Sequence, residues 1–402
     1  MSRDANRYFD KKIKAENDKA MQAAIKQICI NIIDDLEKAK RPSIQSIKES
    51  ADNAVYDFKK GILVPGDKKN TIELNVGSIK KLTRMLLVAE LLMQNVKMGV
   101  VNSKREIYYR IKNSLKGNPN NKEINFEGQD ECDAVIDEIA ASLNLMREDF
   151  NVFANERSGL TYSNALIVTE TLPDKTTATI DLSMIGTTAF VPKNKPQDLA
   201  LSVKKGRKID YCLVIESEGT LSTFFTNGYF LKHQNAILIS TGGVPSMGCR
   251  AFIKKIQDQL KVPIYAYLDL DSWSVAGILR STKSGAFNSL IRSEEFSAPD
   301  IKLLGVLPSD IKKYSLDHYK VDDKDPGENR ALKRADDALK NDPFFKDKRN
   351  KKYREIVEYL LREKIRCEQQ SYFGGSINKS DPKDPYIAEK ILIDKINNKD
   401  WV

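Results

Sequence analysis

The sequence predicts an α/β protein of several domains, with helices in its N-terminal part, a small mixed unit after them and a parallel sheet in its C-terminal half. The chain has 402 residues, which is more than one ordinary hydrophobic core organises. Apolar side chains recur at helical spacing in the first third of the chain, whereas short apolar runs alternate with helical segments after residue 208. We therefore expect three domains, over residues 1–70, 71–195 and 209–402.

Composition and charge narrow the class of protein. Hydrophobic residues make up 41% of the chain and charged residues 30%, a balance typical of packed domains. The formal net charge of +9 favours a polyanionic partner. No run approaches the roughly 20 apolar residues that a membrane span requires, and the charged N-terminus is unlike a signal peptide. We expect no membrane attachment and a cytoplasmic, nucleoid-associated protein, or a nuclear one in a eukaryote.

Cysteine and histidine usage excludes several kinds of site. The five cysteines are scattered without a C-x-x-C pair, so we expect free thiols rather than a zinc site or redox couple. His233 and His318 are the whole histidine content, which leaves little for a His-rich metal centre or a Ser-His-Asp triad. The chemistry has to come from carboxylates, hydroxyls and basic side chains.

Helices dominate the first part of the chain. Isoleucines and a leucine at helical spacing predict a helix over residues 6–40. Residues 41–71 mix Gly, Pro and short apolar pieces and predict irregular structure. A further helix is predicted over residues 77–97, with Gly99 at the expected C-cap.

A capping box predicts the next helix, over residues 104–115. The Ser103 hydroxyl can accept the Glu106 amide hydrogen while the Glu106 carboxylate reaches back. An advance of about 100° per residue separates the two adjacent tyrosines. Tyr108 falls on an apolar face with Ile107, Ile111 and Leu115, whereas Tyr109 falls in a basic stripe with Arg105, Lys112 and Lys116.

A winged-helix unit is predicted around these helices. Residues 131–145 carry apolar side chains at helical spacing, and residues 160–191 are rich in Thr, Ile and Val with turn signals, which predicts strands. Helices followed by a small β-region are typical of a winged helix.

After a Lys-rich connector over residues 193–208, strands and helices alternate. Helical segments such as residues 246–260 separate the apolar runs, which predicts a parallel sheet with right-handed crossovers. A further amphipathic helix is expected over residues 347–370. The expected strands are residues 211–216, 235–241, 263–271 and 302–307.

Acidic residues end two of these strands. Ligands collect at the carboxyl ends of parallel strands, where Glu216 ends the first strand and Asp269 and Asp271 end the third. A spacing of two puts both aspartates on one side of an extended chain. Three carboxylates at a sheet edge suit Mg²⁺. Asp-x-Asp pairs also occur in solvated loops and in other metal-dependent transferases, so this pattern alone leaves the site open.

Tyr109 is the candidate nucleophile. A phenol with a pKa near 10 needs neighbouring positive charge to stabilise its phenolate and to hold a phosphate. Arg105, one helical turn earlier, can supply both. The alternative is a surface tyrosine that contacts DNA phosphates without reacting.

These motifs resemble the family of the topoisomerase VI A subunit, which includes its meiotic relative, the recombination-initiating transesterase. The run from Asn102 to Tyr109 is similar to the family's T-x-R-[DE]-x-[FY]-Y signature, whose last tyrosine is the nucleophile. Glu216 and Ser217 stand in its V-V-E-K, and Asp269 and Asp271 in its D-x-D-P-x-G. Further matches are Gly242, Pro245 and Arg250 in the T-G-K-G-x-P and T-R segments, and residues 304–310 in L-G-L-x-P-S-D.

The matches cover roughly residues 40–390 in the family's order, with several departures. Ser272 and Ser274 replace the family's Pro and Gly, the Lys of its G-K-G turn is absent, and Glu218 offers a second carboxylate near Glu216. The chain is identified as a divergent member. The resemblance implies a CAP-like winged-helix domain followed by a Toprim domain.

The resemblance also implies an activity. Tyr109, assisted by Arg105, would attack a phosphodiester of double-stranded DNA and form a 5′-phosphotyrosyl link, with Mg²⁺ at Glu216, Asp269 and Asp271. Lys112, Lys116 and Arg250 are the expected DNA contacts. Cleavage of both strands needs two tyrosines, hence a homodimer. No ATP-binding signature is apparent in the chain. The resemblance implies a separate GHKL-type ATPase B subunit that would complete a heterotetramer, with the N-terminal helix as its docking element.

Two other functions remain open from the sequence. One is a meiotic-type enzyme that makes double-strand breaks without strand passage. The other is a DNA-binding protein that keeps both domains without catalysis, as Ser272 and Ser274 hint. Covalent protein–DNA adducts would exclude the second, and a neighbouring gene for the ATPase would argue against the first.

Overall fold

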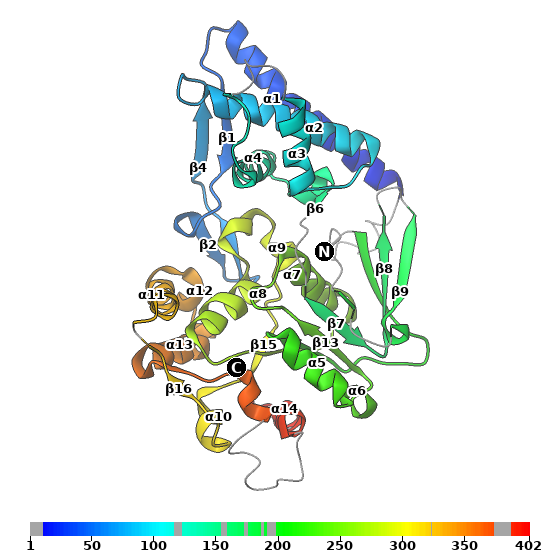
Figure 1. The fold of residues 1–402 in the computed structure, drawn as a ribbon, viewed down its shortest axis with the longest axis vertical. Helices are drawn as coiled ribbons and strands as arrows, with labels where there is room; N and C mark the ends of the chain where they lie inside the picture. The colour runs from blue at the N-terminus through cyan, green and yellow to red at the C-terminus, as the bar shows by residue number, and fades with distance from the viewer. Residues whose placement is uncertain are drawn as a thin grey trace.

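The computed structural model divides the chain into an upper helical unit and a lower unit built on a large sheet (Figure 1). Helices in blue and teal gather in the upper unit, whereas the sheet and the C-terminal helices form the lower one. Two large hydrophobic cores match this division, and a small third cluster of Met146, Ala251 and Phe296 lies where the units meet. The structure describes residues 11–115, 123–153, 159–172, 176–185, 189–190, 198–322, 324–373 and 387–402.

The helical unit is organised around α2, whose apolar face is buried against its neighbours. Gly99 caps α2 in the left-handed conformation, with φ 65°, which glycine adopts at little cost. Two short strand pairs join the helices, β1 with β4 antiparallel and β5 with β6 parallel. The helices are α1 (Lys11–Glu37), α2 (Ile79–Met98), α3 (Lys104–Ser114) and α4 (Gln129–Ser142). The strands are β1 (Ser43–Ile47), β4 (Lys69–Glu73), β5 (Asn102–Ser103) and β6 (Val152–Phe153).

The expectation of irregular structure over residues 41–71 is wrong. Between β1 and β4 the chain forms a hairpin of β2 (Ala54–Asp57) and β3 (Ile62–Pro65). Tyr56 and Leu63 of this hairpin belong to the core of the lower unit. The strands are four or five residues long, so alternation is too brief to distinguish them from loop in the sequence.

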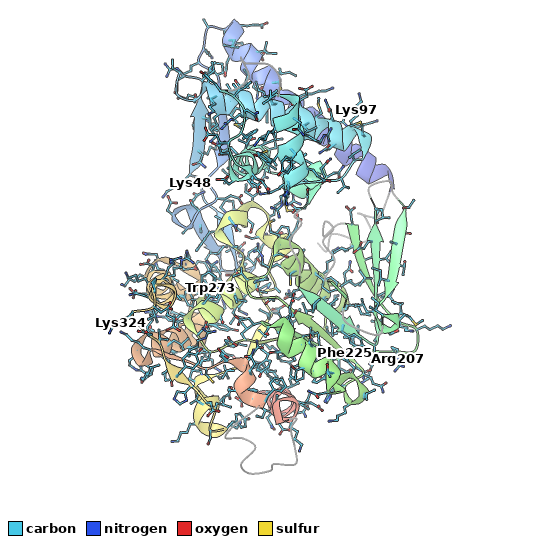
Figure 2. The ribbon with its side chains drawn as sticks, viewed as in Figure 1. Lys48, Lys97, Arg207, Phe225, Trp273 and Lys324 are labelled. Carbon is cyan, nitrogen blue, oxygen red and sulfur yellow. The ribbon has the colours of Figure 1, made fainter. Side chains whose placement is uncertain are left out.

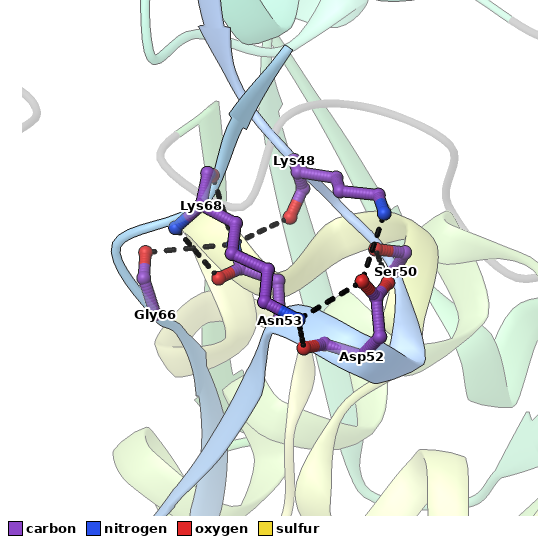
Figure 3. A network of polar contacts seen from close by, with 6 residues as sticks. All are labelled: Lys48, Ser50, Asp52, Asn53, Gly66 and Lys68. Atoms are coloured by element: carbon purple, nitrogen blue, oxygen red, sulfur yellow. Dashed lines mark hydrogen bonds and ion pairs between the residues drawn. The ribbon is translucent and has the colours of Figure 1, made fainter.

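A polar cluster joins the two strand pairs (Figure 3). Asn53 is buried, and its Nδ2 donates to the Lys48 carbonyl at 2.7 Å while its Oδ1 accepts from the Lys68 amide at 2.9 Å. Asp52 holds the ammonium groups of Lys48 and Lys68, at 2.8 and 3.1 Å. Backbone groups that leave the ladders are thereby satisfied by side chains, as buried backbone requires.

The lower unit has a six-stranded sheet in the order β10-β7-β13-β12-β14-β15. The four strands from β13 to β15 are parallel, as the alternation of strands and helices predicts. The parallel strands are β12 (Tyr211–Ile215), β13 (Ala236–Ser240), β14 (Ile264–Tyr267) and β15 (Lys302–Gly305). The helices between them are α5 (Glu218–Thr226), α6 (Tyr229–Lys232), α7 (Met247–Lys255), α8 (Arg280–Ser284) and α9 (Ser293–Phe296).

Strands form within residues 160–191 as predicted, but they do not complete a winged helix. Strand β7 pairs antiparallel with β13, and β10 pairs antiparallel with β7, so β7 and β10 both extend the large sheet. A separate sheet has the order β11-β8-β9, and β11 lies in the region predicted as a connector. Strand pairing is a long-range choice that local pattern does not reveal. The strands are β7 (Leu160–Ser163), β8 (Leu166–Thr171), β9 (Thr177–Asp181), β10 (Ala189–Phe190) and β11 (Leu199–Val203).

The C-terminal region packs on the lower unit. The helix expected over residues 347–370 is shorter, because Lys364 adopts a left-handed conformation at φ 49° and the chain turns into a strand. The helices are α10 (Pro308–Lys313), α11 (Pro326–Asn341), α12 (Pro343–Lys346), α13 (Lys351–Glu363) and α14 (Ile387–Asn397). A small pair joins β16 (Tyr319–Lys320) to β17 (Ile365–Arg366). Within the described ranges, no helix is long and apolar enough to cross a bilayer.

Candidate active site

The two tyrosines of α3 face different surroundings, as the helical spacing predicts. Tyr108 is 7% exposed and belongs to the core of the helical unit, whereas Tyr109 is 45% exposed. The capping box is present, with the Ser103 hydroxyl accepting from the Glu106 amide at 3.1 Å and the Glu106 carboxylate accepting from the Ser103 amide at 2.5 Å. The helix therefore begins at a fixed residue, which sets the direction of Tyr109.

The basic side chains near Tyr109 divide between the two tyrosines. The Arg105 guanidinium lies over the Tyr109 ring, 5.7 Å from its centroid. Lys112 instead donates to the Tyr108 hydroxyl at 2.7 Å, and this hydrogen bond raises the pKa of the Lys112 ammonium. Arg105 is thus the cation that accompanies Tyr109. Lys116 lies outside the described residues.

The three predicted carboxylates meet at one end of the sheet. Glu216 directly follows β12, and its Oε2 accepts a hydrogen bond from the Asp269 amide at 3.2 Å. The strand predicted to run to residue 271 ends at Tyr267, so Asp269 and Asp271 lie in the segment that follows β14. Glu216 and Asp271 line the same hollow, of about 370 Å³.

Arg366 of β17 contacts both aspartates. Its Nη2 lies 3.6 Å from Asp269 Oδ2 and its Nε lies 3.4 Å from Asp271 Oδ2. These contacts show that the two carboxylates point to the same side, as their spacing of two predicts. Arg366 was not among the predicted site residues. Its signal in the sequence was the alternation of apolar Ile365 and Cys367 with charged Arg366 and Glu368. This strand pattern was overlooked because a helix was expected there.

Backbone amides orient the two aspartates. The Gln369 amide donates to Asp269 Oδ1 at 2.9 Å, and the Ser274 amide donates to Asp271 Oδ1 at 2.7 Å. The second bond comes from the backbone, so serine in place of the family's glycine at this position still supports Asp271. Sequence reasoning had left the effect of this replacement open.

Burial and mutual repulsion raise the pKa values of the clustered carboxyl groups. Burial, and then the charges of Asp269 and Asp271, raise the pKa of Glu216 to about 7. Burial and Asp271 raise the pKa of Asp269 to about 6, against a hydrogen bond from Gln369 and the charge of Arg366. Clustered carboxylates with raised pKa values are typical of sites that gain from a bound cation.

The carboxylates fit a divalent cation in chemistry but not in their present arrangement. Oxygen ligands from three side chains are what Mg²⁺ prefers. Among the described residues, however, no group of three acidic, histidine or cysteine side chains is already arranged to hold a metal ion. The Arg366 guanidinium occupies the approach to Asp269 and Asp271, so Arg366 would have to shift when a cation binds.

Two further predicted residues have other surroundings. Glu218 lies in the first turn of α5 with its carboxylate beside Gly242, where a Cβ would meet Glu218 Oε1 at 3.3 Å. It lines a second hollow of about 630 Å³, which it shares with Glu216 and Asp269. Arg250 is 4% exposed, and its Nη2 donates to Ser289 Oγ at 3.3 Å. The expectation that Arg250 contacts DNA is therefore wrong, because α7 turns this side chain into the interior.

A buried ion pair supports the carboxylate end of the sheet. Lys395 of α14 lies 2.6 Å from Asp310 Oδ1, with both side chains fully buried. Tyr372 donates to Asp310 Oδ2 at 2.7 Å and stacks on Tyr267, the last residue of β14. This network links the C-terminal helix to the strand that leads into Asp269.

The structure does not bring Tyr109 to the carboxylates within one chain. Tyr109 contacts Tyr108 and Arg105 in the helical unit. Neither hollow at the carboxylates has a residue of α3 among its described lining residues. The candidate nucleophile and the acidic cluster are therefore two separate half-sites.

Comparison with known proteins assigns both half-sites to one family. Residues 211–391 match the Toprim domain of the topoisomerase 6 A subunit and Spo11, and residues 80–152 match the family described as Type IIB DNA topoisomerase. Several relatives are named as the A subunit of type 2 DNA topoisomerase 6. The one from Methanocaldococcus jannaschii is 29% identical over 93% of this chain and 93% of its own.

Two other relatives carry the same name and match most of this chain. The protein of Saccharolobus shibatae is 26% identical over 98% of this chain and 99% of its own, and that of Pyrococcus abyssi is 26% identical over 92% of each. The matched regions contain α3 with Tyr109 and the segments after β12 and β14 that carry Glu216, Asp269 and Asp271. The chain therefore belongs to the family of topoisomerase 6 A subunits, within the type IIB DNA topoisomerases, and contains the Toprim domain of that family.

Proposed function

We propose that the chain is the subunit that cleaves and reseals DNA in a type IIB topoisomerase, with Tyr109 as the nucleophile. The observation that carries this proposal is the difference between two adjacent tyrosines in the family's matched region. Tyr109 is exposed beside Arg105, whereas Tyr108 is buried and bonded to Lys112. A guanidinium next to an exposed phenol stabilises its phenolate and attracts a phosphate.

The reaction is a transesterification. The Tyr109 oxygen attacks the phosphorus atom of a DNA phosphodiester, and the bond between phosphorus and the 3′ oxygen breaks. The phenol loses its proton and the departing 3′ oxygen gains one, so a 5′-phosphotyrosyl link and a free 3′-hydroxyl result. Resealing is the reverse, with the 3′-hydroxyl displacing the phenol. One phosphoester replaces another, so cleavage itself needs no external energy.

The acidic cluster is the proposed site of Mg²⁺, which would neutralise charge on the phosphate in the transition state. Glu216, Asp269 and Asp271 supply the oxygen ligands, and the amides of Gln369 and Ser274 hold the two aspartates in place. Arg366 would then turn from the aspartates toward the phosphate. The raised pKa values of Glu216 and Asp269 support this proposal, because bound positive charge relieves the repulsion that raises them.

The separation of the half-sites supports a homodimer. Double-strand cleavage requires two tyrosines, and one chain leaves its tyrosine away from its own carboxylates among the described residues. A second copy could supply the missing half of each site. Strand passage would need a GHKL-type ATPase B subunit. The α1 helix, which exposes Ile30, Ile33 and Leu36, is the proposed surface for its docking.

The test is covalent capture on DNA by matched tyrosine variants. Purified protein, with its ATPase partner where one exists, is incubated with labelled duplex, Mg²⁺ and nucleotide and then denatured. We expect labelled protein from the unaltered chain and from Tyr108→Phe, and none from Tyr109→Phe. An adduct that persists in Tyr109→Phe and disappears in Tyr108→Phe would contradict the assignment of both residues.

The same pair of variants separates chemistry from folding. Tyr109→Phe removes an exposed hydroxyl and should change the free energy of unfolding by no more than about 0.5 kcal/mol. Tyr108→Phe loses the bond to Lys112 but keeps the buried ring, so it should remain folded as well. A DNA-binding protein without catalysis would give no adduct with any variant under any of these conditions.

A further inference from the structure

The acidic cluster opens on one side into a hollow that has an aromatic and basic wall. Figure 2 shows Trp273 between α8 and α11, and this residue lines the hollow together with Arg330, Arg334 and Arg366. Glu216 and Asp271 line the same hollow, so its volume of about 370 Å³ is continuous with the candidate metal ligands. This volume falls in the range of small-ligand pockets, roughly 300–1,000 Å³.

Trp273 presents a flat aromatic surface at this place. Its side chain is 37% exposed, although it follows the acidic segment by two residues and lies beside the buried Ser272 and Ser274. The indole packs near Gly277, where a Cβ would lie 3.6 Å from two of its ring atoms. Gly277 lies one turn further along the same helix, so the missing side chain leaves room for the indole beside it. A large, partly exposed aromatic ring beside the acidic cluster is typical of a ligand-binding surface.

The basic part of the wall comes from one face of α11. Arg330 and Arg334 are four residues apart, which places them on the same side of the helix. Both are exposed, and neither has an ion-pair partner among the residues that the structure describes. The Arg334 guanidinium lies 5.4 Å from the centroid of the Trp273 ring. The hollow therefore combines a stacking surface with two guanidinium groups of α11, and the carboxylate of Glu328 from the same helix also lines it.

We propose that this hollow seats one unpaired nucleotide of the DNA strand next to the carboxylates, with the base against the Trp273 indole and a phosphate against Arg330 and Arg334. The inference rests on the proposed DNA-cleaving function. Every base has a π-face, so stacking on an indole tolerates any sequence, and guanidinium groups are suited to phosphate oxygens. Trp273 and the α11 arginines are positioning residues, which hold the strand without taking part in bond exchange.

The chain allows a direct fluorescence test, because it has two tryptophans. Trp401 packs on Tyr265, with ring centroids 5.2 Å apart, so Trp401→Phe keeps an aromatic ring there and leaves Trp273 as the reporter. A 12-residue oligothymidylate is added in EDTA, and the emission of Trp273 is followed. We expect saturable quenching in Trp401→Phe and none in Trp273→Phe. The affinity of Trp273→Ala, measured by anisotropy of a labelled strand, should be about tenfold weaker, because no ring remains for stacking.

The role of the arginines needs a control for total charge. Arg330→Ala with Arg334→Ala should weaken the affinity of the oligonucleotide at least tenfold. Arg354→Ala with Arg362→Ala removes the same charge from exposed residues of α13 and should change the affinity less than twofold. Equal losses for the two pairs, or quenching that survives the α11 pair, would overturn the proposal.

Two more arms identify the ligand. Thymidine monophosphate should compete at least a hundredfold more weakly than the oligonucleotide, and equal competition would mean a free-nucleotide site instead of a strand site. The assay contains no Mg²⁺ and needs no adduct, so its failure is distinct from failure of the proposed function. Covalent capture through Tyr109 with no quenching of Trp273 would reject this inference alone.

Discussion

Burial and two neighbouring carboxylates disfavour the charged form of Glu216. Its pKa rises from the ordinary 4.5 to about 7, because it is buried and faces Asp269 and Asp271. A carboxyl whose pKa is higher in the folded than in the unfolded chain binds more protons when folded. Its charged form therefore costs stability, and this cost develops as the pH rises from 4.5 through about 7.

Glu216→Gln should accordingly stabilise the metal-free protein at pH 8. We expect the free energy of unfolding in EDTA to rise by up to about 3 kcal/mol, and the gain to shrink steadily as the pH falls toward 5. Urea unfolding at several pH values measures it. Glu218→Gln is the matched control for the loss of one carboxylate, since Glu218 lines the adjoining hollow. A Glu216→Gln variant less stable at pH 8 than at pH 5, relative to the unaltered chain, would contradict the assignment.

Some features of single residues follow from the sequence and others do not. The different exposure of Tyr108 and Tyr109 was predictable because both lie on one helix, whose periodicity is a local property. The burial of Arg250 and the contacts of Arg366 with both aspartates were not predictable. They depend on elements far away in the chain, and a guanidinium gives the same signal in a sequence whether it faces DNA or a carboxylate.

At the scale of single elements, the capping box of α3 positions Tyr109, the proposed nucleophile. The bond between the Ser103 hydroxyl and the Glu106 amide fixes where the helix begins, two turns at most before Tyr109. Ser103→Ala should cost about 1 kcal/mol in the free energy of unfolding and should also lower the rate of adduct formation, because the first turn frays. Denaturant unfolding and covalent capture measure the two effects.

A matched control for this prediction lies at the other end of the same helix. The Ser114 hydroxyl donates to the Ile111 carbonyl within the last turn, which the helix does not need. Ser114→Ala should change stability by less than about 0.5 kcal/mol and leave the adduct rate unaltered. Similar effects of both substitutions would show that the cap does not determine the position of Tyr109.

Long periodic elements were predictable, and short strands were not. Helices α2 and α4 and the parallel strands β12 to β15 were identified with boundaries within a few residues, because each buries a continuous apolar face. The hairpin of β2 and β3 was missed because four residues of strand show too little alternation. The pairing of β7 with β13 was missed for another reason, since partner choice is decided only when the whole sheet assembles.

At the scale of the whole molecule, the chain passes between its two units three times. It passes between β1 and β2, between β3 and β4, and between β6 and β7. The first two passages enclose the hairpin, whose Tyr56 hydroxyl accepts from Asn350 at 3.1 Å in the lower unit. Asn53 and Asp52 bind the two passages to each other (Figure 3).

The hairpin can be removed without breaking the ladder of the helical unit. Ile47 pairs with Lys69 at the end of β1 and β4, so a two-residue Asn-Gly turn could replace residues 48–68. We expect this variant to unfold in two separate thermal transitions, because the units then share one passage instead of three. Tyr56→Phe, which loses only a hydroxyl, should keep the transition of the unaltered chain. A single unchanged transition after the deletion would show that the hairpin does not couple the units.

Three spaced passages restrict movement in a way that one linker does not. Two bodies joined by a single flexible strand can swivel about many axes, whereas three connections, two of them joined to each other by Asn53 and Asp52, restrict that rotation. The helical unit that carries Tyr109 is therefore restricted in its movement toward the sheet of its own chain. If the chain acts as proposed, the movement that unites a phosphate, a tyrosine and the carboxylates comes from the approach of a second copy of the chain or from bending of the DNA.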